Sequence, residues 1–157
     1  MGRVRIIAVG SRMPKWVREP FDDYITRLGS GLKISLTEIE PGARTAATSP
    51  AKAIETEGQR ILAALRTSEY VVALDERGTE MTTRELASWL ATRLRDGSDL
   101  AFLIGGPDGF AAEVLQRADF KWSLSRLTFP HALVRVLLAE QLYRAHAVLS
   151  NHPYHRD

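Results

Sequence analysis

With 157 residues, the chain is long enough to bury a complete hydrophobic core, and residues 1–157 are expected to form a single domain. Hydrophobic residues make up 45% and charged residues 25%, as in ordinary soluble globular proteins, and a formal net charge of +2 predicts no partner by itself. The sequence contains no cysteine, which excludes disulfides, thiolate metal sites and a cysteine nucleophile.

Strands and helices alternate along the first half of the chain. A strand is predicted over Val4–Val9, the helix that follows has apolar residues at spacings of three and four, and residues 32–39 alternate as a second strand. Residues 41–48 have no periodicity and predict a mobile loop, which is a plain connection, a lid or a substrate-binding arm. Ser49 and Pro50 predict the next helix start, because a hydroxyl caps the first turn and proline fits its first position.

The alternation continues through the second half. Residues 70–74 predict a buried strand that ends at Asp75, and Thr82 with Glu85 predicts a capping box at a helix start. A second buried strand over residues 100–104 precedes the turn-forming sequence Gly-Gly-Pro-Asp-Gly, a short helix and a strand over residues 120–124. This order predicts an α/β protein with a mainly parallel sheet flanked by helices.

The last helix, predicted from His131 to about Ser150, is apolar around nearly its whole circumference. A helix of this kind is buried on several sides, which in so small a chain indicates a subunit interface. Glu140 and Arg144 are spaced to form an ion pair along this helix.

The loops after the strands are the best candidates for a site, because ligands of open parallel sheets bind outside the carboxyl ends of the strands. Leu74, residues 105–109 and residues 124–129 lie at the ends of three predicted strands. Together they could form an apolar slot with backbone polar groups, which suits a purine ring. The glycine sequence matches neither a Walker loop nor a dinucleotide fingerprint, and alone it is also compatible with a plain turn.

A metal site is not expected. A zinc site built on the C-terminal histidines would need a third ligand, and only Asp157 lies nearby. The sequence also has no Ser-His-Asp order and no paired carboxylates at catalytic spacing. The histidines concerned are His131, His146, His152 and His155.

The C-terminal tail has two interpretations. Tyr154, His155 and Arg156 combine a stacking ring, a titratable group and a phosphate donor, as RNA contacts often do, and are candidate catalytic or substrate contacts. Alternatively, the tail is simply solvated and contributes little that could be buried.

Six segments spread over most of the chain carry a specific resemblance. They are AVG-x-RMPKW near the start, EGQRIL at residues 57–62, ALD at residues 73–75, LIGGPDG, WSLSRLTFPHALVRVLLAEQLYRA and the terminal NHPYHR. Together they closely resemble the ribosomal large-subunit methyltransferase H family of the SPOUT, or α/β-knot, superfamily. Residues 41–52 match no pattern of the family, so no role is carried over to them.

The resemblance implies a fold with a C-terminal trefoil knot, which the usual rules for chain connections would have rejected. It implies a homodimer that methylates N3 of a pseudouridine in helix 69 of 23S ribosomal RNA within the assembled 70S ribosome. The implied methyl donor is S-adenosylmethionine, with no metal, and neither DNA nor a membrane is expected as a partner.

The resemblance does not identify the group that accepts the N3 proton, which could be His155, His131 or solvent. Two other classes of function remain: a non-catalytic ribosome-binding factor of the same fold, and a flavodoxin-like protein that binds flavin or phosphate. No secretory or membrane segment is recognised, so a cytoplasmic protein is expected.

Positions that match the family imply the residues of the cofactor site. The implied cofactor contacts are Leu74, Gly105, Leu124, Ser125, Arg126, Leu127, Thr128 and Phe129.

Overall fold

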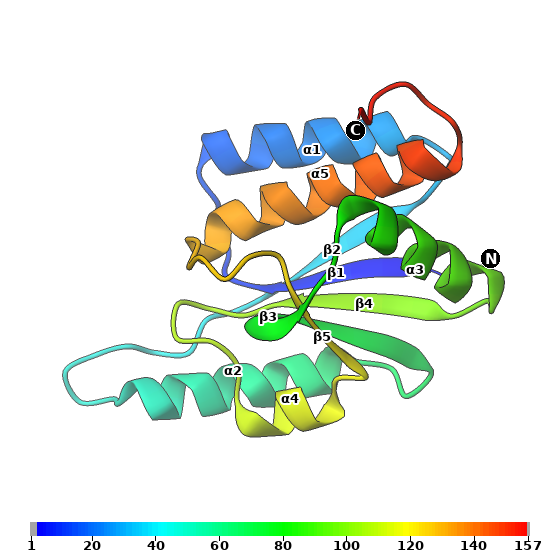
Figure 1. Cartoon of the computed structure of the whole chain (residues 1–157). Coiled ribbons are helices and arrows are strands. Elements are labelled where there is room, and N and C mark those ends of the chain that lie inside the picture. Colours follow the sequence, from blue (N-terminus) through cyan, green and yellow to red (C-terminus); the bar gives the residue numbers. More distant parts are fainter. Residues whose placement is uncertain (1–2, 157) are drawn as a thin grey trace.

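A computed structural model describes residues 3–156 and shows one sheet of five strands with helices on both faces (Figure 1). The strand order is β2-β1-β4-β3-β5, and every neighbouring pair is parallel. The predicted α/β class with a parallel sheet is therefore confirmed. The strands are β1 Val4–Val9, β2 Ile34–Ile39, β3 Glu69–Glu80, β4 Asp99–Ile104 and β5 Phe120–Ser123; the helices are α1 Lys15–Leu28, α2 Pro50–Ala64, α3 Thr83–Arg95, α4 Ala112–Arg117 and α5 His131–Leu149.

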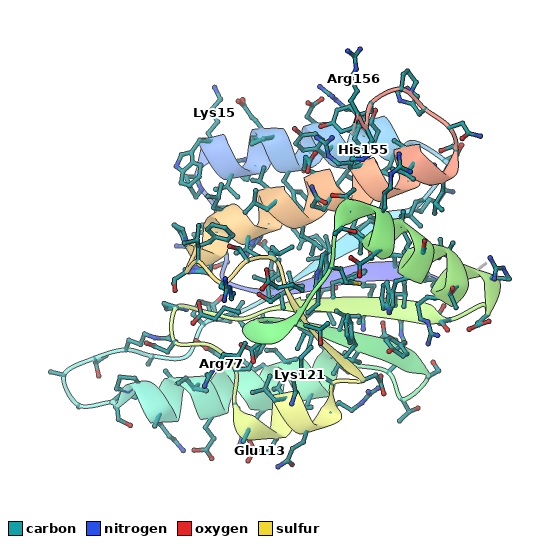
Figure 2. The ribbon with its side chains drawn as sticks, in the orientation of Figure 1. Lys15, Arg77, Glu113, Lys121, His155 and Arg156 are labelled. Atoms are coloured by element: carbon teal, nitrogen blue, oxygen red, sulfur yellow. The ribbon has the colours of Figure 1, made fainter. Side chains whose placement is uncertain are left out.

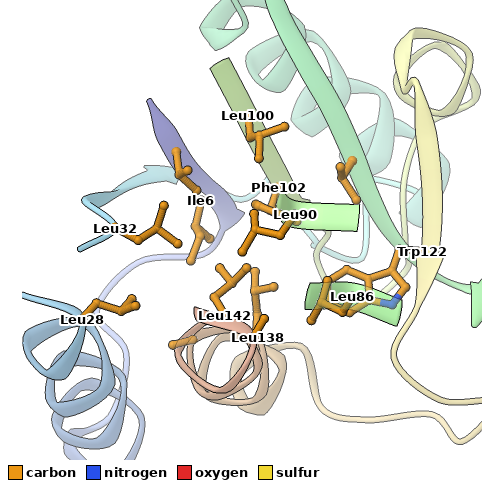
Figure 3. Close-up of a cluster of buried hydrophobic side chains, with 14 of the residues drawn as sticks. Ile6, Leu28, Leu32, Leu86, Leu90, Leu100, Phe102, Trp122, Leu138 and Leu142 are labelled. Atoms are coloured by element: carbon orange, nitrogen blue, oxygen red, sulfur yellow. The ribbon is translucent and has the colours of Figure 1, made fainter. Parts of the chain in front are cut away.

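The helices form two layers around the sheet. Helices α1, α3 and α5 cover one face, while α2 and α4 cover the other (Figure 1). Side chains of central strand β4 alternate between the layers. Phe102 packs toward α5 (Figure 3), and Leu103 belongs to the cluster on the opposite face, with residues of α2 and α4. The predicted two-sided burial of this strand is confirmed, and it explains why its sequence is apolar without interruption.

Two helix starts are capped as the sequence predicts. The Ser49 hydroxyl accepts a hydrogen bond of 3.2 Å from the Lys52 backbone N–H. The Thr82 hydroxyl accepts one of 3.1 Å from the Glu85 N–H, and the Glu85 carboxylate accepts one of 3.3 Å from the Thr82 N–H. Each cap satisfies backbone donors that the first helical turn leaves free.

Strand β3 does not end at Asp75 as predicted. Its pairing with β5 is interrupted after Leu74 and resumes at Thr79, opposite Trp122. Gly78 makes this return possible, because a Cβ there would lie 2.5 Å from the Lys121 carbonyl oxygen. The sequence does not predict this second half of β3, because its residues are polar and pair with β5 through the backbone, which leaves no apolar pattern.

The strand order excludes the flavodoxin-like alternative. Flavodoxin-like sheets have the order 2-1-3-4-5, whereas here β3 and β4 are exchanged and β4 lies in the centre. That alternative is wrong. Among the described residues, no helix is both long enough and apolar enough to cross a membrane.

Helix α5 is confirmed over almost its predicted length. It packs against α1, α3 and the sheet, and Leu138, Leu142 and Ala145 are fully buried there (Figure 3). Leu133 and Leu137 remain half-buried on the outer side of the helix. The apolar circumference is thus only partly explained by packing within one chain.

Candidate active site

A cavity of about 360 Å³ lies at the carboxyl ends of β4 and β5, beside the part of β3 where pairing with β5 is interrupted. Three segments line it: residues 74–77 in β3, the glycine loop (residues 104–110 between β4 and α4), and the segment at residues 124–131 that joins β5 to α5. The loops that the sequence predicts to form a slot therefore line one cavity. These segments are distant in sequence and meet because β3 is the parallel neighbour of both β4 and β5, so its interruption after Leu74 lies beside the carboxyl ends of those two strands.

Seven of the eight residues implied as cofactor contacts line this cavity. The exception is Arg126, whose side chain is 89% exposed and whose Nε lies 3.6 Å from the Glu80 carboxylate. Its side chain therefore points away from the cavity toward the far end of β3. The seven are Leu74, Gly105, Leu124, Ser125, Leu127, Thr128 and Phe129.

Hydrogen bonds shape the segment between β5 and α5. The Ser123 hydroxyl donates to the Ser125 carbonyl oxygen at 2.8 Å, and the Ser125 hydroxyl accepts from the Leu127 N–H at 3.0 Å. The Thr128 hydroxyl donates to the Glu76 carboxylate at 2.8 Å and so ties the segment to β3. These bonds hold a segment without helix or strand in a defined curve around the cavity.

The glycine loop needs its small residues for two different reasons. Gly109 has a φ of +84°, a conformation that favours glycine, and its N–H donates to the Gly106 carbonyl oxygen at 3.1 Å. At Gly105 a Cβ would lie 3.3 Å from the backbone of Gly109 and 3.4 Å from the Phe110 ring. A larger residue at position 105 would therefore push against the loop itself.

His131, at the start of α5, also lines the cavity. Burial is the main cause that lowers its pKa below the usual value for histidine, and the guanidinium groups of Arg135 and Arg44 lower it further, while Glu57 opposes them. The imidazole is therefore neutral at neutral pH and has a nitrogen lone pair available to accept a proton.

The residue-level prediction of the cavity missed several lining residues. Asp75 and Asp108 belong to quoted motifs but were assigned no role of their own. Phe110 and Leu115 carried no signal, since apolar residues beside a short helix are usually core. Their contribution depends on which strand ends meet, and that is a tertiary property.

Tyr154, His155 and Arg156 do not lie at the cavity of their own chain. His155 and Arg156 fold back along the C-terminal end of α5, near α1 (Figure 2), and Tyr154 contacts Glu140 and Tyr143 of α5. The Tyr154 ring centroid lies 4.6 Å from that of Tyr143, which follows His131 by twelve residues and is therefore about 18 Å along the helix from it.

The tail is also more ordered than a solvated extension. Tyr154 and His155 are half-buried, so the expectation that the tail contributes little burial is wrong. A ring nitrogen of His155 lies 3.4 Å from the Arg144 guanidinium, while Arg156 is exposed. Over residues 3–156 no cluster of three metal-ligating side chains is found; Asp157 lies outside the described residues.

The chain is similar to known proteins over its whole length. Residues 2–155 match the family model described as "Predicted SPOUT methyltransferase". The ribosomal RNA large subunit methyltransferase H of Alkalilimnicola ehrlichii is 54% identical, with coverage of 98% of this chain and 99% of that protein. The corresponding protein of Thiobacillus denitrificans is 50% identical, with coverage of 99% of both chains.

A solved structure supports the fold independently. The crystal structure of a probable methyltransferase from Bordetella pertussis superposes with a TM-score of 0.59 at 19% identity, covering 92% of this chain and 95% of that one. At this identity the likeness concerns the fold alone. Membership rests on the full-length match to the family model and on the identity of 50% to 54% to its members. This match shows that the protein is an enzyme and excludes the alternative of a non-catalytic binding factor. The protein belongs to the ribosomal RNA large subunit methyltransferase H family of SPOUT methyltransferases.

Proposed function

We propose that this protein transfers the methyl group of S-adenosylmethionine to N3 of a pseudouridine in helix 69 of 23S ribosomal RNA, acting on the assembled 70S ribosome in the cytoplasm. The observation that carries the proposal is the sequence identity of 54% and 50%, over nearly the full chain, to two ribosomal RNA large subunit methyltransferases H. The cavity supports it, because the segments implied as cofactor contacts come together there.

The cavity fits the chemistry of the proposed methyl donor. Leu74, Leu124 and Phe129 supply apolar surface for an adenine ring, and the glycine loop brings backbone groups close without side chains in the way. Asp75 and Asp108 supply negative charge at the same cavity, which complements the positive sulfonium and amino groups. These residues would hold the cofactor between β3 and the glycine loop.

The reaction needs positioning and a proton acceptor more than it needs a metal. A bond forms between N3 and the methyl carbon as the carbon–sulfur bond breaks, and the N3 proton must leave; in-line placement supplies much of the rate. The absence of cysteine argues against the covalent route used for methylation at carbon 5 of pyrimidines. We propose His131 as the proton acceptor, since it lines the cavity and its lowered pKa keeps it neutral.

We further propose a homodimer in which α5 supplies the interface. Leu133, Val136 and Leu137 are half-buried apolar residues on one side of this helix, and Trp16 at the start of neighbouring α1 is 59% exposed. Apolar side chains left accessible on neighbouring helices support a protein contact there. A second copy would also give the tail a function. Because the tail lies far from the cavity of its own chain, Tyr154 and Arg156 would contact substrate at the cavity of the partner subunit.

The C-terminal trefoil knot is part of the proposal. Support comes from the path around the cavity: the chain leaves β5 beyond β3, runs along residues 74–77, and enters α5 on the sheet face that α1 and α3 share. The hydrogen bond from Thr128 to Glu76 lies on this path. A knotted segment would hold the cavity walls in place without a disulfide.

Two measurements test the function. Isothermal titration calorimetry with S-adenosylmethionine tests the cavity, and mass spectrometry of helix 69 tests the product after incubation with ribosomes from a strain that lacks the modification. The expected result is cofactor binding and a mass increase of one methyl group on the pseudouridine. Cofactor binding with no change in the mass of helix 69 would exclude the proposed substrate.

A further inference from the structure

The Arg44 loop, defined as residues 40–49 between β2 and α2, matches no family pattern, yet it is joined to the cofactor cavity by one guanidinium. Arg44 Nη1 lies 2.6 Å from Oε2 of Glu57 on α2, and its Nε lies 2.9 Å from Oδ2 of Asp108 in the glycine loop. Residues from a loop, a helix and the cavity wall thus share one cation.

The Glu57 end of this contact is buried. The Glu57 side chain is 2% exposed, and its carboxylate also accepts a hydrogen bond of 3.0 Å from the Gly42 N–H. A buried carboxylate must be paired, because burial without a partner is costly. Glu57 therefore fixes the inner side of the Arg44 loop and the orientation of the Arg44 guanidinium.

Glu57 also lies directly beneath the glycine loop. A Cβ at Gly106 would lie 3.1 Å from the Glu57 Oε1 atom. The glycine loop is thus supported from below by this carboxylate and held at its outer end by Arg44 through Asp108. The Asp108 side chain is 39% exposed and lines the cavity, whereas Arg44 does not line it.

We infer that Arg44 is a positioning residue of the cofactor cavity, which holds the glycine loop in its binding shape through Asp108 and couples that shape to the Arg44 loop. The inference rests on the proposed function, since the cavity is the one that would hold S-adenosylmethionine. It assigns a role to a loop that otherwise reads as a plain connection. Loss of the contact between Arg44 and Asp108 weakens cofactor binding, and by linkage cofactor binding strengthens that contact to the same extent.

The test compares Asp108→Asn, Arg44→Lys and the double variant with a matched control. Lysine keeps a cation opposite Glu57 but lacks the planar fork needed to serve both carboxylates. The control is Arg60→Gln: Arg60 Nη1 donates to the carbonyl oxygens of Glu40 and Pro41 at 2.8 and 3.1 Å, in the same loop but away from the glycine loop.

Each single variant is expected to raise the Kd for S-adenosylmethionine about fivefold, the lower end of typical coupling between sites. The KM for the cofactor should rise likewise, with kcat at saturating cofactor little changed. The double variant should bind no more weakly than Asp108→Asn alone, because Asp108→Asn already removes the contact that Arg44→Lys weakens. Arg60→Gln should bind like wild type.

Two results would overturn the inference. If Arg44→Lys binds the cofactor like wild type while Asp108→Asn does not, Asp108 acts by direct contact and Arg44 has no positioning role. If amide hydrogen exchange in the glycine loop of the ligand-free Asp108→Asn variant matches wild type, the contact does not hold the loop. Failure of wild type itself to bind the cofactor would instead reject the proposed function.

Discussion

The phenol hydroxyl of Tyr154 donates a hydrogen bond of 3.1 Å to Oε1 of Glu140, fourteen residues earlier in the chain. The same carboxylate pairs with Arg144, whose guanidinium carbon lies 4.6 Å from the centre of the Tyr154 ring. Burial, followed by the neighbouring Tyr24 and Glu140, raises the pKa of Tyr154. The phenol is therefore a neutral donor at physiological pH, docked on α5 rather than free in solvent.

The docked tail leads to a prediction about substrate contacts. Arg156→Ala should lower single-turnover methyl transfer to ribosomes at least about tenfold, since misplacement of a target can cost more than that. Arg156 is exposed and has no described structural contact, so thermal stability and S-adenosylmethionine binding should not change. Arg95→Ala, at an exposed position at the end of α3, is the control. Undiminished transfer by Arg156→Ala would remove the tail from the substrate site.

Tyr154 itself should have two separable roles. Tyr154→Phe removes the hydrogen bond to Glu140 but keeps the ring, at a stability cost of about 1 kcal/mol. Tyr154→Ala also removes a stacking surface worth about 1–3 kcal/mol in RNA contacts. Methyl transfer should therefore fall much further in the alanine variant than in the phenylalanine variant, as single-turnover assays can measure. Equal activity of the two variants would contradict a stacking role.

At the cofactor cavity, Gly105→Val should abolish S-adenosylmethionine binding in a folded protein. The first added carbon would lie 3.3 Å from the Gly109 backbone, and the branched side chain must then displace the glycine loop. Gly97→Ala is a useful control: Gly97 has a φ of +72° with open space around its Cβ position, so this change should cost stability and leave cofactor affinity intact. An affinity of Gly105→Val within about threefold of wild type, under roughly 1 kcal/mol, would show that the cavity is misassigned.

Assembly is tested at the outer side of α5. Leu137→Arg places a charge in the proposed apolar interface at a cost of several kcal/mol and should yield monomers in sedimentation or light scattering. The matched control is Leu36→Arg, because Leu36 is 37% exposed on edge strand β2. A monomeric wild-type protein would defeat the dimer proposal, and a dimeric Leu137→Arg variant would move the interface elsewhere.

His131 predicts a specific dependence of stability on pH. Because its folded pKa lies below the unfolded value of about 6.5, the unfolded state binds the proton first as pH falls. The free energy of unfolding should therefore decrease from about pH 6.5 down to the lower folded pKa and level off beneath it. His131→Gln should show a shallower decrease over this window in urea denaturation. Parallel pH profiles for the two proteins would mean that the environment of His131 does not disfavour its charge.

Local patterns in the sequence were sufficient to predict most of the elements. The uninterrupted apolar run of β4, the alternation in β2 and the caps at Ser49 and Thr82 depend on neighbours a few residues away. Hydrophobic periodicity reports burial directly, so these elements could be placed without knowing what they pack against. The carboxyl ends of parallel strands share one edge, which is why the cavity could also be located.

Tertiary structure alone decided three other features. The second half of β3 pairs through its backbone with β5, Tyr154 folds back onto Glu140, and Arg44 meets Asp108 across 64 positions of sequence. None of these contacts has a periodic signature, because each joins polar groups that are far apart along the chain. The order of strands brings β3 beside β5 and Arg44 near Asp108, and the turn after α5 brings Tyr154 back to Glu140. The sequence by itself determined the layers and the location of the cavity, whereas the strand order β2-β1-β4-β3-β5 determined which polar groups meet around it.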